Sequence, residues 1–524
     1  MATMLTSIPR SISWRLISSI SRQFSTHDSR QSTDLNSEPP KPSLPPFQIS
    51  PQADTISRLL IEHHNPFHTM ESSLQLNGIN LSSNLVHQTL IRLKNVSKIA
   101  LGFFIWAKEH PIYEHDCVSY NIMIDILGKV RQFDVAWQLI VEMDQRDVTP
   151  NSKTFGVLIR RLIAAGRTRQ AIRTFDDMES FVEKEVDLDD FGYLLDTLCK
   201  YGYVKVATEL FNKRKFRFKP DVKIYTILIY GWCKMNRPQM AERFFKEISE
   251  CGLEPNVVTY NVLLNGICRK SSLHPDMRFE TVIRAAEELL EEMQRRGIEP
   301  DVTSYSIVLH VYSRAHKPQL SLDKLNFMKE KGIFPTIATY TSVIKCLCSC
   351  DRMEDAEKLL DEMVSNGVSP SPATYNCFFK EYKGRKDAET ALKLYRKMGE
   401  SSCLPSMHTY NVLIAMFSKL NIMDTVKEIW EDMKVSGVGP DLDSYTLLIH
   451  GLCEKQKWRE ACQYFVEMIE KGFLPQKITF ETLYKGLIQA DMLRTWRRLK
   501  KKIDEESITF GSEFKDLHFK PYKR

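Results

Sequence analysis

The sequence predicts an all-α fold: a right-handed superhelical solenoid of stacked helix-turn-helix repeats, each about 35 residues long. An aromatic residue followed by an aliphatic run returns at intervals of 35, 36, 34, 35 and 45 residues, and then five times at 35. Each interval contains two apolar runs at helical spacing, and nine of the ten units end in a turn with a recurring proline. Two short helices cannot bury their apolar faces alone, whereas stacked copies form a continuous core.

The N-terminal segment, residues 1–24, predicts a transit peptide that is removed on import. Arg10, Arg15 and Arg22 are interspersed with serines and apolar residues at amphipathic spacing, and no acid precedes Asp28. This composition is typical of organelle targeting. The sequence around Arg22 resembles a mitochondrial processing site, so we expect a mitochondrial protein. Chloroplast or dual import is the alternative address, and a disordered basic tail is the alternative structure.

The next two segments connect this leader to the repeats. Residues 25–50 are rich in Ser and Pro and predict a disordered linker. Residues 51–116 predict a helical region that contains a degenerate repeat at 82–116. No other stretch approaches the roughly 18 apolar residues that a membrane span needs, so none is expected.

Ten full repeats are expected between residues 117 and 476, with a cap after them. The unit 257–301 contains a ten-residue insertion around 271–282, which we expect to be a surface loop between its helices. A half unit at 477–511 is expected to cap the array, and residues 512–524 form a basic tail. The ten units are 117–151, 152–187, 188–221, 222–256, 257–301, 302–336, 337–371, 372–406, 407–441 and 442–476.

Small and flexible apolar residues recur in the second helix of the units. An alanine such as Ala136 lies early in that helix, where it allows close helix approach, and a methionine such as Met143 lies near its end. We expect both to be core residues. The recurring Cys199, Cys233 and Cys268 are likewise expected to be small buried hydrophobes rather than metal ligands, because no CxxC pairs or HExxH motif accompany them.

Composition excludes several protein classes but identifies no function. The chain of 524 residues is 43% hydrophobic and 26% charged, unlike a collagen, a wholly disordered chain or a polytopic membrane protein. Lys and Arg (72) exceed Asp and Glu (66) by 6, which does not establish a nucleic-acid partner.

The units resemble pentatricopeptide repeats. The resemblance is carried by the period of 35, by openings such as VVTYNVLLNGIC (257–268), and by endings such as EEMQRRGIEPD (291–301). A tetratricopeptide array would repeat at 34 with a Trp-Leu-Gly-Tyr pattern that this sequence lacks. Units of the plain 35-residue kind resemble the P class of plant organelle proteins.

The resemblance implies an RNA-reading surface on the concave face of the solenoid. In the family, the fifth residue of each unit meets a base edge together with the last residue of the unit, so that one repeat reads one base. Short polar side chains suit this task because they hold a donor or acceptor at fixed reach; the alternative is that they are ordinary helix caps. The pairs are Asn121/Asn151, Gly156/Asp187, Gly192/Asp221, Thr226/Asn256, Asn261/Asp301, Ser306/Thr336, Thr341/Ser371, Asn376/Ser406, Asn411/Asp441 and Thr446/Gln476.

The family code gives a partial target. Asn with Asp implies U, Asn with Ser implies C, Thr with Asn implies A, and Asn with Asn implies a pyrimidine. From 5′ to 3′ this gives a pyrimidine, two unread bases, A, U, two unread bases, C, U and one unread base. Gly156 and Gly192 have no side chain with which to read. The second residue of a unit is usually an apolar wedge between bases; Val118 and Val258 fit, whereas Lys153, Asp189, Lys223, His408 and Asp443 do not.

We therefore expect a single-stranded RNA-binding adaptor for mitochondrial transcripts, acting in their stabilisation, processing, splicing or translation. No cofactor, small-molecule substrate or enzymatic activity is expected. The expected partners are organellar RNA and, with it, RNA-processing, splicing or ribosomal proteins. The alternative function is a protein-interaction solenoid, such as a structural subunit of an organellar ribosome or complex.

Overall fold

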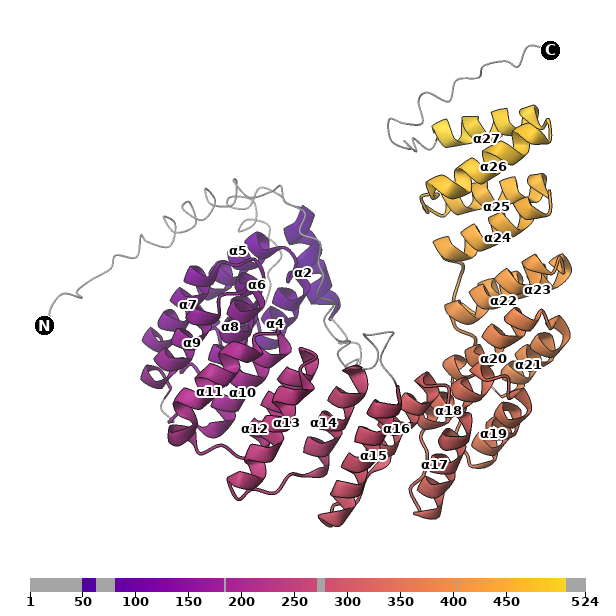
Figure 1. The fold of residues 1–524 in the computed structure, drawn as a ribbon. Helices are drawn as coiled ribbons and strands as arrows, with labels where there is room; N and C mark the ends of the chain where they lie inside the picture. Colours follow the sequence, from indigo (N-terminus) through magenta and orange to yellow (C-terminus); the bar gives the residue numbers. More distant parts are fainter. Residues whose placement is uncertain (1–49, 63–80, 183–184, 271–278, 402, 506–524) are drawn as a thin grey trace, which may run out of the picture. The chain divides into compact units, whose positions relative to one another are not determined.

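The structure, a computed structural model, describes residues 50–62, 81–182, 185–270, 279–401 and 403–505. All regular elements in these ranges are helices, and no strand occurs among them (Figure 1). The predicted all-α fold of helical hairpins is therefore confirmed. The expected transit peptide, nearly all of the expected linker, residues 271–278 of the expected insertion, and the basic tail lie outside the described residues.

The chain divides into two compact units, of which the first comprises the described residues up to Val130 together with Val135–Leu139. In this unit α2 packs on α4, and α4 and α5 both pack on α6. The ring of Phe104 meets the ring of Tyr120 edge to face at 5.2 Å, in the core of this unit. Its helices are α2 (Pro51–Glu62), α4 (Ser83–Arg92), α5 (Ser97–Lys108) and α6 (Cys117–Lys129).

The second unit consists of Arg131–Asp134 and the described residues from Ile140 onward. Helix α7 (Phe133–Gln145) has residues in both units. The first helices of the second unit's hairpins are α8 (Ser152–Ala164), α10 (Leu188–Lys200), α12 (Val222–Lys234), α14 (Val257–Lys270), α16 (Val302–Arg314), α18 (Ile337–Ser349), α20 (Pro372–Arg385), α22 (Met407–Lys419), α24 (Leu442–Glu454) and α26 (Lys477–Gln489).

The second helices follow in alternation with the first. They are α9 (Thr168–Asp177), which continues into the 3-10 helix η2 (Met178–Ser180), α11 (Val204–Phe218), α13 (Pro238–Glu250), α15 (Phe279–Arg295), α17 (Pro318–Glu330), α19 (Met353–Ser365), α21 (Ala388–Glu400), α23 (Met423–Val435), α25 (Trp458–Glu470) and α27 (Leu493–Glu505). The half unit expected after residue 476 thus contains two helices, α26 and α27, which pack on each other.

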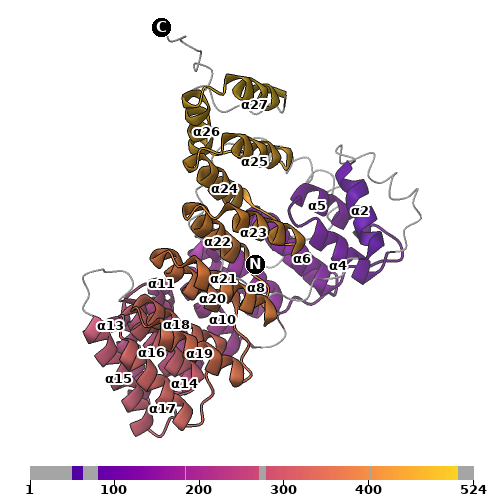
Figure 2. The same ribbon diagram turned by 90° about the vertical axis from the view of Figure 1, so that its right-hand side faces the viewer.

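The first helices form one layer within the second unit. Each contacts the next first helix along the chain, from α8 and α10 through to α24 and α26, and each also packs on its hairpin partner (Figures 1 and 2). This arrangement places equivalent positions of successive repeats side by side. A residue near the start of one first helix therefore lies close to the start of the next.

The core consists of the residue types that return with the period. The recurring aromatic of each first helix is buried, and several of these tyrosines bond to the second helix: Tyr340 donates to Glu362 and Tyr445 to Glu467, each at 3.0 Å. The recurring alanines and methionines of the second helices, among them Ala136 and Met143, are also buried, which confirms their predicted core role. No helix in the described part of the chain is long and apolar enough to span a membrane.

Candidate nucleic-acid interface

The last residue of a unit and the fifth residue play different structural roles. The last residue is the N-cap of the next first helix: Asp301, for example, accepts the backbone N–H of Ser304 at 2.8 Å. Asn, Asp, Ser and Thr are preferred there because their side chains satisfy an unpaired N–H of the first turn. The fifth residue lies one turn inside the helix and is not a cap; it is half-buried except at Gly156 and Gly192, which are buried. The helix-cap interpretation therefore describes the last residues but not the fifth residues.

A buried hydroxyl connects the two positions across neighbouring repeats. Asn261 donates from Nδ2 to Asp301 Oδ1 at 3.0 Å, although the two residues are 40 apart in sequence. Ser304, the third residue of the following unit, is fully buried, and its Oγ lies 2.6 Å from Asn261 Oδ1 and 3.0 Å from Asp301 Oδ1. The hydroxyl thus bridges the two predicted reading side chains and fixes their orientation.

The same bridge recurs in four other units. The hydroxyl of Thr226 lies 2.8 Å from that of Thr259, which in turn donates to Asn256 at 3.0 Å. Hydroxyl bridges of 2.6–2.8 Å from the fifth to the third position are therefore a repeated feature of this face. The remaining bridged sets are Ser306–Thr339–Thr336, Thr341–Thr374–Ser371 and Asn411–Ser444–Asp441.

The other predicted pairs depart from this geometry. Asn121 and Asn376 each have a buried amide oxygen that lacks a hydrogen-bond partner. Ser406 bonds to Thr409 at 2.9 Å, as the last residues of bridged units do, but the link from Thr409 to the amide oxygen of Asn376 is missing. Thr446 donates to its own helix at Leu442 O, and Gln476 makes no side-chain cap. Asn151 caps α8 through Thr154 N at 3.1 Å.

A further pair, absent from the sequence prediction, lies in the degenerate repeat. His87 Nε2 lies 2.8 Å from Asp116 Oδ1, and the same carboxylate oxygen accepts both the N–H and the hydroxyl of Ser119 at 2.8 Å. His87 is the fifth residue of α4 and Asp116 is the N-cap of α6, so they occupy the two pair positions. If the repeat begins at residue 82, as expected from the sequence, Val86 is its fifth residue. Because Ser82 is the N-cap, the helix begins at Ser83, and the fifth residue is His87.

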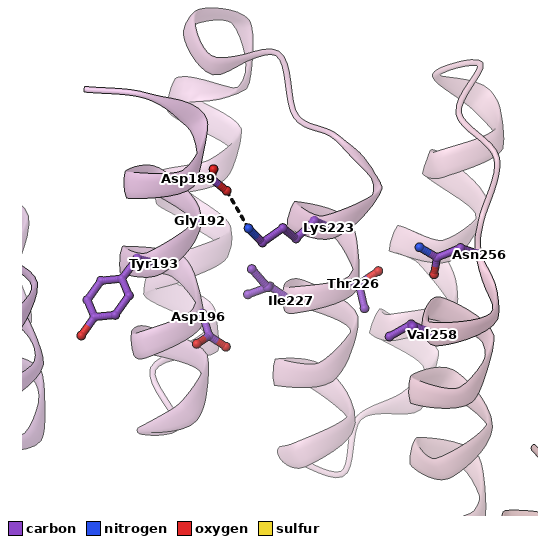
Figure 3. Close-up of a pocket in the computed structure, with 9 residues that line it drawn as sticks. All are labelled: Asp189, Gly192, Tyr193, Asp196, Lys223, Thr226, Ile227, Asn256 and Val258. Carbon is purple, nitrogen blue, oxygen red and sulfur yellow. Dashed lines mark hydrogen bonds and ion pairs between the residues drawn. The ribbon is translucent and has the colours of Figure 1, made fainter. Parts of the chain in front are cut away.

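The two glycines at fifth positions are covered by neighbouring side chains. A Cβ atom added at Gly156 would lie 3.1 Å from Cε1 of Tyr193, and one added at Gly192 would lie 3.0 Å from Cδ1 of Ile224. Next to Gly192, the second-position residues Lys223 and Asp189 form an ion pair at 2.6 Å (Figure 3). By contrast, the apolar second-position residue Val258 is 60% exposed, as a wedge requires.

Cavities between successive first helices carry basic residues at one end. A cavity of about 380 Å³ is lined by Asn261 and Asp301 and, at the helix ends, by Lys234 and Arg269. The next, of about 600 Å³, is lined by Ser306, Arg269, His310 and Arg314. Burial, with Arg314 and Lys345 nearby, lowers the pKa of His310, so its ring is neutral at neutral pH. The reading side chains and the cations therefore share the same cavities.

The carboxylates of three pairs, Asp301, Asp441 and Asp116, are held ionised. Burial opposes ionisation of Asp301, but hydrogen bonds from Ser304 and Asn261 outweigh it and lower its pKa below the usual value. Asp441 and Asp116 are shifted in the same direction, by Ser444 with Asn411 and by His87 with Ser119. A carboxylate that stays ionised is an acceptor only, which limits the base edges it can meet.

The recurring cysteines are packing residues. Cys199, Cys233 and Cys268 are buried, as predicted, and so are Cys348 and Cys453; none of the five forms a disulfide. Burial raises the pKa of the Cys268 thiol to about 12, so it stays protonated at neutral pH. Within the described residues no group of three or more His, Cys, Asp or Glu side chains is placed to hold a metal ion.

Comparison with known proteins identifies the repeats. The profile of the PPR repeat family matches residues 115–164, 220–269, 335–383, 373–419, 405–454 and 440–489. The profile of the pentatricopeptide repeat domain matches 288–349, and that of the PPR repeat matches 153–181. Together these matches span more than half of the chain.

Related proteins agree with this assignment. A mitochondrial pentatricopeptide repeat-containing protein of Arabidopsis thaliana is 65% identical over 483 residues, covering 92% of this chain and 94% of the relative. Its name confirms the predicted mitochondrial localisation. A second mitochondrial relative from Arabidopsis thaliana is 33% identical over 43% of this chain and 40% of its own length. The structure of maize PPR10 with an 18-nt psaJ RNA element aligns with 96% of this chain and 78% of its own, at 18% identity and a TM-score of 0.46. On the profile matches and the 65% identical relative, the chain belongs to the pentatricopeptide repeat family.

Proposed function

We propose that the chain is a sequence-selective adaptor that binds single-stranded RNA of mitochondrial transcripts, one base per repeat. The observation that carries this proposal is the bridged pair: fifth and last residues far apart in sequence are held together by a buried hydroxyl at the same place in successive repeats. Packing alone does not require polar side chains to be oriented in this way. Recognition of a base edge does require it.

Each pair presents a fixed set of donors and acceptors to one base. Asn261 contributes an amide whose rotation is restricted by Ser304, and Asp301 contributes an ionised acceptor. Val258 separates neighbouring bases as an exposed apolar wedge. Lys234, Arg269 and Arg314 at the ends of the same cavities contact the phosphates, so we expect affinity to fall as salt rises.

The adaptor acts without chemistry of its own. By occupying a transcript it blocks nucleases, changes RNA folding, or positions a processing, splicing or translation partner. The pairs differ in structure: five are bridged, two have glycine as the fifth residue, and Gln476 makes no side-chain cap. We therefore expect the chain to select the base at only some positions of the bound RNA.

The test exchanges one pair for another present in the chain. The variant Asn261→Thr with Asp301→Asn reproduces the Thr226/Asn256 pair, whose hydrogen bonds run through the same third position. RNA selected from a random pool by the full chain should carry U at the base facing this pair, and A with the double variant. Asp221→Asn is the matched control: Asp221 is an N-cap at 2.9 Å from Ile224 N, but its fifth-position partner is Gly192. It should leave the selected sequence unchanged.

Two outcomes contradict the adaptor function. One is a pool without enrichment, and the other is an exchange that leaves the enriched base as it was. A structural subunit of an organellar complex is the second candidate, favoured by the Lys223–Asp189 ion pair at two second positions. It predicts that the protein sediments with the ribosome after RNase has released the transcripts.

A further inference from the structure

The consecutive units with glycine at the fifth position contain an aromatic side chain that no reading pair uses. Tyr193, the sixth residue of its unit, is the only aromatic at that position among the ten repeats. It follows Gly192, and its ring covers Gly156 of the preceding unit, where an added Cβ would lie 3.1 Å from Cε1. The ring thus occupies the space that a fifth-position side chain fills elsewhere.

The ring is held at both ends and remains accessible. Its backbone belongs to α10, and its hydroxyl donates to the carbonyl oxygen of Gly156 in α8 at 3.1 Å. Burial raises the pKa of Tyr193, so the phenol keeps this proton at neutral pH. Nevertheless 43% of the residue is exposed. Figure 3 shows the ring directed away from Lys223 and Thr226, towards the neighbouring helix.

The cavity at this ring suits an uncharged planar group. It measures about 350 Å³ and is lined by Gly156 and Tyr193 together with the cations Lys153 and Arg160. Its lining also contains two carboxylates: Asp189 is paired at 2.6 Å with Lys223, which lies outside the lining, and Asp190 accepts from the N–H of Asp187 at 3.4 Å. Charges of both signs therefore line the cavity, and the aromatic face is the uncharged feature that a base can use.

We propose that the unit of Gly156 holds an RNA base by stacking on Tyr193 and accepts all four bases. The proposal rests on the proposed function, because it assigns the second base of the same bound strand. Aromatic stacking tolerates every base, since each has a π-face, whereas reading an edge needs a fixed donor or acceptor. With no side chain at Gly156, no such group is contributed by the fifth residue.

The experiment uses ten-nucleotide RNAs built on the expected register: a pyrimidine, two varied positions, A, U, two varied positions, C, U and one varied position. The second nucleotide is U, C, A, G or an abasic residue, and binding to the full chain is measured by fluorescence anisotropy. The four bases should bind within about twofold of one another, and the abasic RNA about tenfold more weakly. Tyr193→Leu should abolish the difference between base and abasic RNA. Tyr193→Phe keeps the ring and should preserve the difference in affinity between base and abasic RNA.

The outcomes separate this inference from the function on which it rests. Equal binding of the abasic and normal RNAs by the unmodified chain overturns the stacking site, as does a strong preference for one base at this nucleotide. A Tyr193→Leu protein that still discriminates against the abasic RNA overturns it too, and assigns the ring to packing over Gly156. An abasic residue at the fifth nucleotide, facing Asn261 and Asp301, is the reference: if it also has no effect, the proposed function itself fails.

Discussion

Ser304 allows a test of whether a fully buried residue sets base preference. Ser304→Ala removes the hydroxyl 2.6 Å from Asn261 Oδ1 and leaves that amide oxygen without its bridge. One half of the capping box survives, because Asp301 still accepts the backbone N–H of residue 304 at 2.8 Å, and Asn261 Nδ2 still donates to Asp301. The other half, the bond of 3.2 Å from the Asp301 N–H to the Ser304 hydroxyl, is lost with the hydroxyl. The change therefore loosens the orientation of the pair without removing either reading group.

The size of the expected effect follows from the hydrogen bonds that Ser304→Ala removes and from those that it leaves. Losing a hydrogen bond that leaves a buried partner unsatisfied costs about 1–3 kcal/mol. Because Asn261 keeps one bond to Asp301, we expect the low end, about 1 kcal/mol, both in local stability and in discrimination between U and C. At 1.4 kcal/mol per factor of ten, this is a loss of about fivefold in base preference.

The assay measures both quantities on the full chain. Hydrogen exchange of the first amides of α16 reports local stability, which suits a repeat array in which a single unfolding transition is not assured. Competition between RNAs with U or C at the fifth nucleotide reports discrimination. Ser304→Thr, which restores the hydroxyl found at the third position of many other units, should behave like the unmodified protein. If Ser304→Ala retains its full preference for U, the bridge does not orient the pair.

Two further predictions concern packing and pH. Gly266→Ala would place a Cβ 2.0 Å from Cys233 Sγ, so thermal denaturation should show a loss of about 1–3 kcal/mol, whereas Gly399→Ala, with open space around it, should show none. The native pKa values of Asp301 and Asp441 lie below the ordinary value of 3.8, so their stabilisation is complete above that pH and is lost as the pH falls through the lower native values. Circular dichroism below about pH 4 should therefore show acid-induced loss of helix that the Asp301→Asn, Asp441→Asn double variant reduces; an unchanged acid profile would contradict this assignment.

The period allowed nearly all of the fold to be predicted. It located the hairpins because an aromatic, an alanine and a methionine must return wherever two helices pack on identical neighbours. It was less informative at the ends. The degenerate repeat has Val86 at the position where the other repeats have their aromatic residue. Its start was therefore placed one residue too early, and the His87–Asp116 pair was not predicted. The segment after residue 476 was expected to be a half unit, whereas it contains both helices of a hairpin, α26 and α27.

The candidate site was predictable in position but not in construction. Spacing located the fifth and last residues, yet the third residue that connects them belongs to the next repeat, as Ser304 does for Asn261. The repeat pattern gives the position of a residue within its own unit, but it does not show which residues of adjacent units are in contact. Tyr193 was missed for the same reason, because its ring serves the glycine of the preceding repeat.

The double role of the last residue explains why base preference can vary without loss of the fold. Asp301, Ser371 and Asn256 all cap the next helix, and these three residue types rank nearly equal as N-caps. Exchanging one for another leaves the array nearly as stable while changing which groups face a base. Gln476 makes no side-chain cap, and its unit has no bridge from Thr446 to the next helix. If capping and reading depend on the same side chain, the reading array should end at this unit, and the identity of the base facing Thr446 should not affect affinity.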